Sequence, residues 1–278
     1  MSPYPVQAVV VGVDDSAAST QAVRLAAGEA LGQQRPLCLL HAFNWMPVAA
    51  SGEQWSRHAA EQLLARAEQA AQERAPGVQV MSQIVEGSPL HALRHASRNA
   101  ALIVIGDGGL AGYVTLPVES TAMRVAAEAE CSVIVVRDQG ERPGPVLVGV
   151  DGTAHADQAL GVAFDIAAQR RTELVIMHVD EVRKDGTDHP SPTSDSQREA
   201  MVAQWRQKYP GVVTRQRHER GDPARLLVEA AGSAALAVVG ARGERPSHGM
   251  LGPVCLSVLH HAPCPVVIVR GRHRPTRS

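Results

Sequence analysis

Residues 8–16 read AVVVGVDDS and residues 145–153 read PVLVGVDGT, so a short valine run ending in Gly-Val-Asp occurs twice in this chain. Three further blocks recur in the same order: EGSP at 86–89 as RGDP at 220–223, LIVIGDGG at 102–109 as LAVVGARG at 236–243, and CSVIVVR at 131–137 as CPVVIVR at 264–270. The units of stacked solenoid proteins are roughly 20–50 residues long, whereas each repeat here spans half of the 278-residue chain. The sequence therefore predicts two duplicated domains, at 1–140 and 141–278.

Composition narrows the class of protein. Hydrophobic residues make up 45% of the chain and charged residues 20%, as in ordinary globular proteins, but aromatic residues make up only 3%. With so few aromatic residues, the hydrophobic core must be built from aliphatic side chains, as in parallel sheets covered by helices. The net charge of −1 gives no general attraction to nucleic acid or to an anionic membrane. The first apolar run is too short for a signal peptide or a membrane span, and the four cysteines lack CxxC spacing. We expect buried free thiols in a cytoplasmic protein.

Strand-like and helix-like segments alternate along both halves. This alternation predicts two tandem Rossmann-like, doubly wound α/β domains, each with a five-stranded parallel sheet in the order 3-2-1-4-5 and helices on both faces. The expected strands are 6–13, 37–43, 79–85, 101–105 and 132–136, then 145–150, 173–179, 212–218, 235–239 and 265–269; the expected helices of the first half are 17–31, 53–74, 88–97 and 119–128.

Two other features bear on organisation. The polar stretch 183–197 is expected to be a loop. The apolar fifth strands Val133–Val136 and Val266–Val269 would be exposed at sheet edges, which promotes aggregation. We expect them to be covered, by pairing with each other in an intrachain pseudo-dimer or with another copy in a homo-oligomer.

A carboxylate follows the first strand of each half, at Asp14 and Asp151, and a glycine-rich loop follows the fourth. In doubly wound sheets, ligands bind beyond the carboxyl ends of the strands where the strand order reverses, between strands one and four. Glycine backbone and the next helix can hold an anion, and a carboxylate can accept hydrogen bonds from ribose hydroxyls or an adenine amino group. Alternatively, the aspartates only cap helix one and the glycines only turn the chain. Their joint recurrence favours a nucleotide site.

These motifs resemble the universal stress proteins in their tandem two-domain form, nearly end to end. The shared features are the GVD strand end, the GxP helix start, the G-x2-G loop and the A-x-C-P-V entry into strand five. ATP-binding members carry G-x2-G-x9-G-[ST], whose glycine backbone and hydroxyl hold phosphates, while the first-strand Asp and a residue after strand two hold the nucleoside. The resemblance thus implies ATP, with or without Mg²⁺. The residues implied are Asp14, Ala42, Gly106, Gly109 and Ser120 in the first half, and Asp151, Val179, Gly240, Gly243 and Gly252 in the second.

Both halves depart from the phosphate motif. Glu119 stands where the first half should have its third glycine, and with Asp107 it brings negative charge toward the phosphates. One such contact at 4 Å costs about 4 kcal/mol at an effective dielectric of 20. In the second half Gly252 comes one residue early and Pro253 replaces the Ser/Thr, which costs about 1–3 kcal/mol in hydrogen bonds. Arg242 remains available to a phosphate oxygen. The second half is therefore the better candidate.

The expected function is that of a stress-response protein that binds an adenine nucleotide and regulates a protein partner through its bound state. The alternative is a structural or partner-binding protein whose two pockets are degenerate, which Glu119 and Pro253 favour. A slow ATPase or nucleotidyl-transfer activity is a third interpretation, but no general base, GxSxG or G-x4-GK[ST] motif accompanies the loops. We therefore expect a binding protein and no enzyme.

Histidines recur at the end of the second strand, and we expect His41 and His178 to be hydrogen-bonded structural residues. A metal site at the candidates near the C-terminal end would need a supporting pair of histidines at i and i+4 or a CxxC motif among them, and they have neither. We therefore expect no metal at the remaining candidates, which are His248, Cys255, His260, His261 and Cys264.

Overall fold

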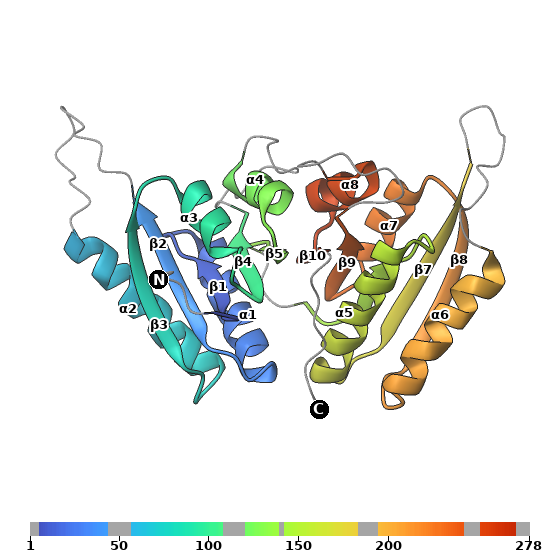
Figure 1. Ribbon diagram of the computed structural model, residues 1–278, viewed down its shortest axis with the longest axis horizontal. Coiled ribbons are helices and arrows are strands. Elements are labelled where there is room, and N and C mark those ends of the chain that lie inside the picture. Colours follow the sequence, from blue (N-terminus) through green and yellow to red (C-terminus); the bar gives the residue numbers. More distant parts are fainter. Residues whose placement is uncertain are drawn as a thin grey trace. The chain divides into compact units, whose positions relative to one another are not determined.

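The computed structural model describes residues 6–43, 57–107, 120–138, 142–182, 194–241 and 251–270 (Figure 1). These residues form two compact units that divide after Asp138, the first coloured blue to green and the second yellow-green to red in Figure 1. The limits 1–140 and 141–278 stay a prediction. Within the described ranges, no helix is both long enough and apolar enough to cross a membrane.

The first unit alternates strand and helix throughout. Its strands are all parallel and lie in the order β3-β2-β1-β4-β5, which confirms the predicted order 3-2-1-4-5. Its elements are β1 (Val9–Gly12), α1 (Ala17–Gly32), β2 (Leu37–Phe43), α2 (Arg57–Arg74), β3 (Val80–Glu86), α3 (Pro89–Ala96), β4 (Leu102–Gly106), α4 (Thr121–Glu128) and β5 (Ser132–Val136).

The second unit repeats this topology. Its parallel strands lie in the order β8-β7-β6-β9-β10, which are the third, second, first, fourth and fifth strands of that half. Its elements are β6 (Val146–Gly149), α5 (Ala154–Arg170), β7 (Leu174–Glu181), α6 (Asp195–Lys208), β8 (Thr214–Gly221), α7 (Pro223–Ala231), β9 (Leu236–Gly240), α8 (Pro253–His261) and β10 (Val266–Val269).

Helices cover both faces of each sheet, as expected for strands that are apolar on both sides. In the first unit, α1 and α2 pack together on one face, and α3 and α4 pack together on the other. In the second unit, α5 pairs with α6, and α7 pairs with α8. The central strands are completely enclosed: Val9, Val10 and Val11 of β1 have no exposed surface.

Two helices begin at residues that the sequence pattern placed wrongly. Helix α4 begins at Thr121, not at Glu119, because the hydroxyl of Ser120 accepts the N–H of Met123 and so makes Ser120 the N-cap. Helix α6 begins at Asp195, inside the stretch 183–197 that was expected to be a loop.

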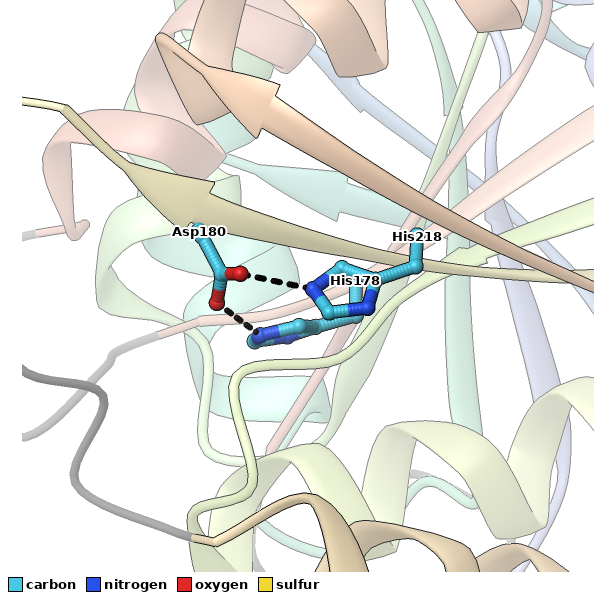
Figure 2. A group of neighbouring side chains, drawn as sticks. All are labelled: His178, Asp180 and His218. Atoms are coloured by element: carbon cyan, nitrogen blue, oxygen red, sulfur yellow. Dashed lines mark hydrogen bonds and ion pairs between the residues drawn. The ribbon is translucent and has the colours of Figure 1, made fainter.

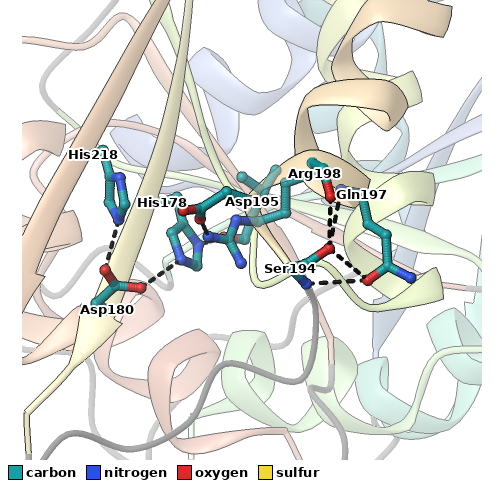
Figure 3. Close-up of polar contacts among 9 residues, drawn as sticks. His178, Asp180, Ser194, Asp195, Gln197, Arg198 and His218 are labelled. Carbon is teal, nitrogen blue, oxygen red and sulfur yellow. Dashed lines mark hydrogen bonds and ion pairs between the residues drawn. The ribbon is translucent and has the colours of Figure 1, made fainter.

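The reason for the early start of α6 is a capping box (Figure 3). The Ser194 hydroxyl accepts the N–H of Gln197 at 3.3 Å, and the Gln197 side chain accepts the N–H of Ser194 at 3.0 Å. Two amides that a helix start leaves without partners are satisfied in this way.

Helix α6 packs on α5 through aromatic rings. Trp205 and Tyr209 stack on Phe164, and the Trp205 Nε1–H donates to Asp157 Oδ1 at 2.8 Å. Gly161 makes room for the indole, because a Cβ there would lie 2.6 Å from Trp205 Cη2. The ring therefore fits only against a residue without a side chain.

Candidate functional site

Two predicted carboxylates and two predicted glycines, Asp14 and Asp151 with Gly106 and Gly240, lie at the carboxyl ends of neighbouring strands. In the first unit, Asp14 follows β1 and Gly106 ends the neighbouring β4. A Cβ on Gly106 would lie 2.8 Å from the Ala18 carbonyl carbon, so the end of β4 directly faces the first turn of α1. In the second unit, Asp151 follows β6 and Gly240 ends the neighbouring β9 in the same way.

Neither aspartate is the N-cap of the following helix; Ser16 and Thr153 hold that position. Instead, Asp151 Oδ1 accepts the Thr153 N–H at 3.0 Å and its hydroxyl at 2.7 Å, and Asp14 Oδ1 accepts the Ser16 N–H at 3.0 Å. Both aspartates are exposed. One carboxylate oxygen therefore fixes the turn, while the other, Oδ2, has no hydrogen-bond partner in the described parts of the chain and can accept from a ligand.

His178, inside β7, ends the ladder between β6 and β7. The Val150 N–H donates to the Met177 carbonyl at 2.9 Å, and in a parallel ladder the next bond would run from the Val179 N–H to the Val150 carbonyl. His178 Nδ1 lies 2.8 Å from that carbonyl instead. Across the described residues, no backbone bond joins Val179 to Val150. The N–H and C=O of Val179 therefore point past the end of β6, toward the side where Asp151 lies.

The first unit repeats this arrangement. The Val13 N–H donates to the Leu40 carbonyl at 2.9 Å, and His41 Nδ1 lies 2.8 Å from the Val13 carbonyl. Ala42 holds the position of Val179, and its backbone is likewise left without a bond to Val13 within the described ranges. Both histidines are hydrogen-bonded to backbone, as predicted. Their effect on the neighbouring backbone could not be read from the sequence.

The helices that follow the glycine loops start differently in the two units. Gly252 is the N-cap of α8 without a side-chain hydrogen bond, and its N–H donates to the Ala241 carbonyl at 2.9 Å. The first turn of α8 thus lies beside the end of β9. Because Pro253 is the first residue of this turn and has no N–H, the turn offers one backbone donor fewer to a ligand. In α4 the Ser120 hydroxyl already accepts the Met123 N–H at 3.2 Å, so that amide is not available to an anion.

The two units also differ in charge beside these helices. In the first unit Asp107 pairs with Arg137 at 3.8 Å, and both side chains are largely buried. The negative charge of Asp107 is therefore balanced by Arg137 and not presented alone to a phosphate, contrary to the expectation from sequence. In the second unit Ala241 replaces Asp107, while Arg270 keeps the position of Arg137. Arg270 therefore has no carboxylate at the position that Asp107 holds beside Arg137.

Arg270 lies close to the first turn of α8. Burial raises the pKa of the Cys255 thiol to about 12, and the charge of Arg270 acts in the opposite direction on it. Cys255 belongs to the first turn of α8. Motif reasoning missed Arg270, although the repeated CSVIVVR and CPVVIVR blocks contained the signal. Four predicted positions lie outside the described residues: Gly109 and Glu119 in the first half, and Arg242 and Gly243 in the second.

A further polar cluster, not predicted from the sequence, joins β7 and β8 (Figure 2). His178 and Asp180 alternate along β7, and His218 is the register partner of His178 on β8. Asp180 Oδ1 lies 3.1 Å from His178 Nε2, and Asp180 Oδ2 lies 2.7 Å from His218 Nε2. Burial opposes the ionisation of Asp180, but the hydrogen bonds from His218 and His178 outweigh it and hold the pKa of this carboxyl below its ordinary value.

The cysteines offer poor metal ligands. All four are free and buried. Burial raises the pKa of Cys38 to about 11 and that of Cys255 to about 12, so the thiolates of these two residues are scarce at neutral pH. His260 and His261 lie with their rings 6.0 Å apart, and His248 lies outside the described residues. Within the described ranges, the cluster of Figure 2 is the group of three or more such side chains whose ligand atoms converge.

Comparison with known proteins gives one consistent result. Residues 5–137 and residues 144–270 each match the Universal stress protein family. A universal stress protein of Mycobacterium tuberculosis strain H37Rv is 33% identical over 285 residues, which cover 94% of this chain and 96% of that protein. One from Mycolicibacterium smegmatis is 35% identical over 289 residues, with 95% and 97% covered. The crystal structure of a universal stress protein from Archaeoglobus fulgidus superposes with a TM-score of 0.72 at 20% identity, covering 96% of this chain and 99% of that one.

Proposed function

The chain belongs to the universal stress protein family in a tandem two-domain form, and we propose that its second half binds an adenine nucleotide, ATP, as the input of a regulatory function. The binding site lies at the carboxyl ends of β6, β7 and β9 and at the start of α8. One observation carries the proposal: His178 Nδ1 bonds to the Val150 carbonyl, so within the described residues the Val179 backbone makes no bond to β6, at the end of the sheet where Asp151 follows that strand.

The Val179 N–H and C=O offer one donor and one acceptor in a fixed geometry. The Watson–Crick edge of adenine carries an acceptor nitrogen next to a donor amino group, which complements such a pair. Asp151 keeps Oδ2 for the ribose hydroxyls, since Oδ1 accepts from Thr153. These two contacts support a nucleoside, and they recur in the first half at Ala42 and Asp14.

The two halves differ in the residues that would hold the phosphates. The start of α8 has no side-chain cap, and its helix dipole favours an anion. Arg270 adds positive charge near this turn, and Ala241 brings no carboxylate. Gly240 and Gly252 let the backbone approach the phosphates, and Arg242 and Gly243 complete the proposed set. In the first half Gly106, Gly109 and Ser120 remain, but Glu119 brings a carboxylate next to Ser120 in the sequence.

The proposed role is regulation, not turnover. The four buried thiols suit the reducing cytoplasm, where we place the protein. A protein partner would read the bound state. That the fifth strands are covered, either by each other within the chain or by a second copy, stays a prediction.

Mass spectrometry of small molecules released from the purified, denatured protein tests the proposal. We expect an adenine nucleotide, and the released compound, added back with and without Mg²⁺, should bind the emptied protein. GTP should bind more weakly, since guanine presents the opposite donor and acceptor order to Val179. A protein that releases no nucleotide and binds none at millimolar concentration would instead have two degenerate pockets, the alternative that Pro253 and Glu119 favour.

A further inference from the structure

Three side chains of the second unit direct their ligand atoms at one point on the sheet. One ligand atom of each residue, an imidazole nitrogen of His178 and of His218 and a carboxylate oxygen of Asp180, lies within 4.8 Å of the other two (Figure 2). The register of β7 and β8 sets this geometry, because His178 is directly opposite His218, and Asp180 lies two residues further on the same face of β7. A rigid pair of strands, not a loop, therefore holds the three groups together.

The tautomer of His178 is fixed by its other nitrogen. Nδ1 lies 2.8 Å from the Val150 carbonyl, which can only accept, so Nδ1 carries the hydrogen. In the neutral imidazole, Nε2 then presents a lone pair to Asp180 Oδ1, 3.1 Å away. Two acceptors at that distance need a cation between them, either a proton or a metal ion. A histidine that donates Nδ1–H to a backbone carbonyl and presents Nε2 is the usual arrangement of a metal-ligating histidine.

From this geometry we propose that His178, Asp180 and His218 bind one exchangeable divalent transition-metal ion of the Zn²⁺ class. Two imidazoles and a carboxylate are donors that suit such ions. The proposal does not depend on nucleotide binding. Three protein ligands leave at least one coordination position open, as in zinc sites that retain water. The side chains of Asp180 and His218 are 42% and 53% exposed, so that position is accessible to solvent.

The distances require little rearrangement. Zinc bonds to histidine nitrogen and carboxylate oxygen are about 2.0–2.2 Å, so two ligand atoms of a tetrahedral ion lie about 3.4 Å apart. His178 Nε2 and Asp180 Oδ1 are already 3.1 Å apart. The other contact, between His218 and Asp180, is 2.7 Å and must lengthen, which the half-exposed His218 ring can do by a small rotation.

Nearby positive charge is balanced. Figure 3 draws Arg198 of α6 together with the cluster, and its side chain is buried. An ion pair with Asp195 compensates its charge. Arg220, the register partner of Asp180, is exposed and has other interactions.

The first half provides an internal comparison. His41 makes the same bond to a backbone carbonyl, so its tautomer is fixed in the same way. Phe43 stands in the position of Asp180, however, and Ile84 stands opposite His41 where β8 has His218. The first half therefore keeps the structural histidine but lacks the other two ligands, and we expect no metal there.

The test uses the full-length chain after treatment with EDTA and dialysis, titrated with ZnCl₂ by isothermal titration calorimetry. We expect one tight equivalent per chain. Asp180→Asn and His218→Ile each remove a direct ligand and should weaken binding by more than about 100-fold, the upper end of the loss seen for residues that only support a ligand. His218→Ile copies the first half at an exposed position, and circular dichroism checks that both variants remain folded.

Two matched variants control for adventitious binding to surface histidines. His58→Gln on α2 and His261→Gln on α8 remove other histidines and should leave the affinity and stoichiometry unchanged. Visible absorption of bound Co²⁺ gives a second readout, with d–d bands that appear at one equivalent and disappear in Asp180→Asn. The proposal is overturned if the wild-type chain has no tight site, if both ligand variants keep the site, or if a control variant loses it. The three side chains would then be held together by protons alone.

Discussion

Replacing Asp151 by asparagine separates its role in a ligand site from its role in the fold. Oδ1 of Asp151 accepts the Thr153 N–H at 3.0 Å and the Thr153 hydroxyl at 2.7 Å, and Thr153 in turn caps α5 by accepting the Ala156 N–H at 3.3 Å. Asparagine keeps an Oδ1 that can make the same turn. It replaces the remaining oxygen with an NH₂ group, which donates and cannot accept from a ribose hydroxyl.

The expected magnitude follows from that one lost acceptor. A hydrogen bond to a charged group contributes about 1.5–3 kcal/mol, and each 1.4 kcal/mol is about tenfold in affinity. Asp151→Asn should therefore weaken ATP binding about 10- to 150-fold, with little change in thermal stability. Asp151→Ala removes the turn as well, so it should abolish binding and also lower stability, by about 0.5–2 kcal/mol as for a lost cap.

Calorimetric titration with ATP and a thermal melt of each variant provide the assay. Asp14→Asn is the matched control, because Asp14 makes the same turn with Ser16 in the half that we expect to be empty. Its affinity for ATP should equal that of the wild-type chain. The reasoning is wrong if Asp151→Asn binds ATP like the wild type, or if Asp14→Asn is the variant that loses it.

Three other experiments test separate features of the structure: one variant at Glu119, a pair of glycine variants, and the reactivity of Cys255. Glu119→Gly, in a chain whose second site is disabled by Asp151→Ala, should restore ATP binding to the first half. Removing one carboxylate at 4 Å from a phosphate relieves about 4 kcal/mol of repulsion. A folded variant that still binds no ATP would show that this half lost its site for other reasons. Gly161→Ala places a Cβ 2.6 Å from Trp205 Cη2 and should destabilise the chain by about 1–3 kcal/mol in urea titrations. Gly28→Ala, whose Cβ meets nothing closer than 3.9 Å, should stabilise it by about 1 kcal/mol, and equal effects would contradict the packing argument. Cys255, with its pKa raised to about 12, should react with a thiol reagent at pH 8 only as fast as α8 opens; rapid reaction in the native state would show that it is accessible.

Much of the fold could be predicted from the repeated motifs. Each valine run became a strand whose apolar side chains are buried, and the order 3-2-1-4-5 is the one expected for parallel, right-handed connections. Helix starts were less predictable, because a cap depends on a bond between a side chain and a backbone amide. Ser120 and Ser194 make such bonds, and they moved the starts of α4 and α6 by about two residues or more.

The candidate site was predictable only where a motif is local in sequence. Asp151 follows a strand end, and sequence alone indicated its place. The cluster around Asp180 depends on the register that places His178 opposite His218, which no local pattern reveals. The same holds for the backbone of Val179, whose freedom depends on one ring nitrogen taking the Val150 carbonyl.

The most direct test of the central claim is the number of ATP molecules that the wild-type, full-length chain binds. The chain, emptied of any bound nucleotide, is titrated with ATP in a calorimeter. We predict one equivalent per chain, because the second half has the uncapped start of α8 with Arg270 nearby, whereas the first half has Glu119 before α4 and an α4 start already capped by Ser120. Two equivalent sites would contradict the asymmetry, and no binding at millimolar ATP would contradict the proposed function itself.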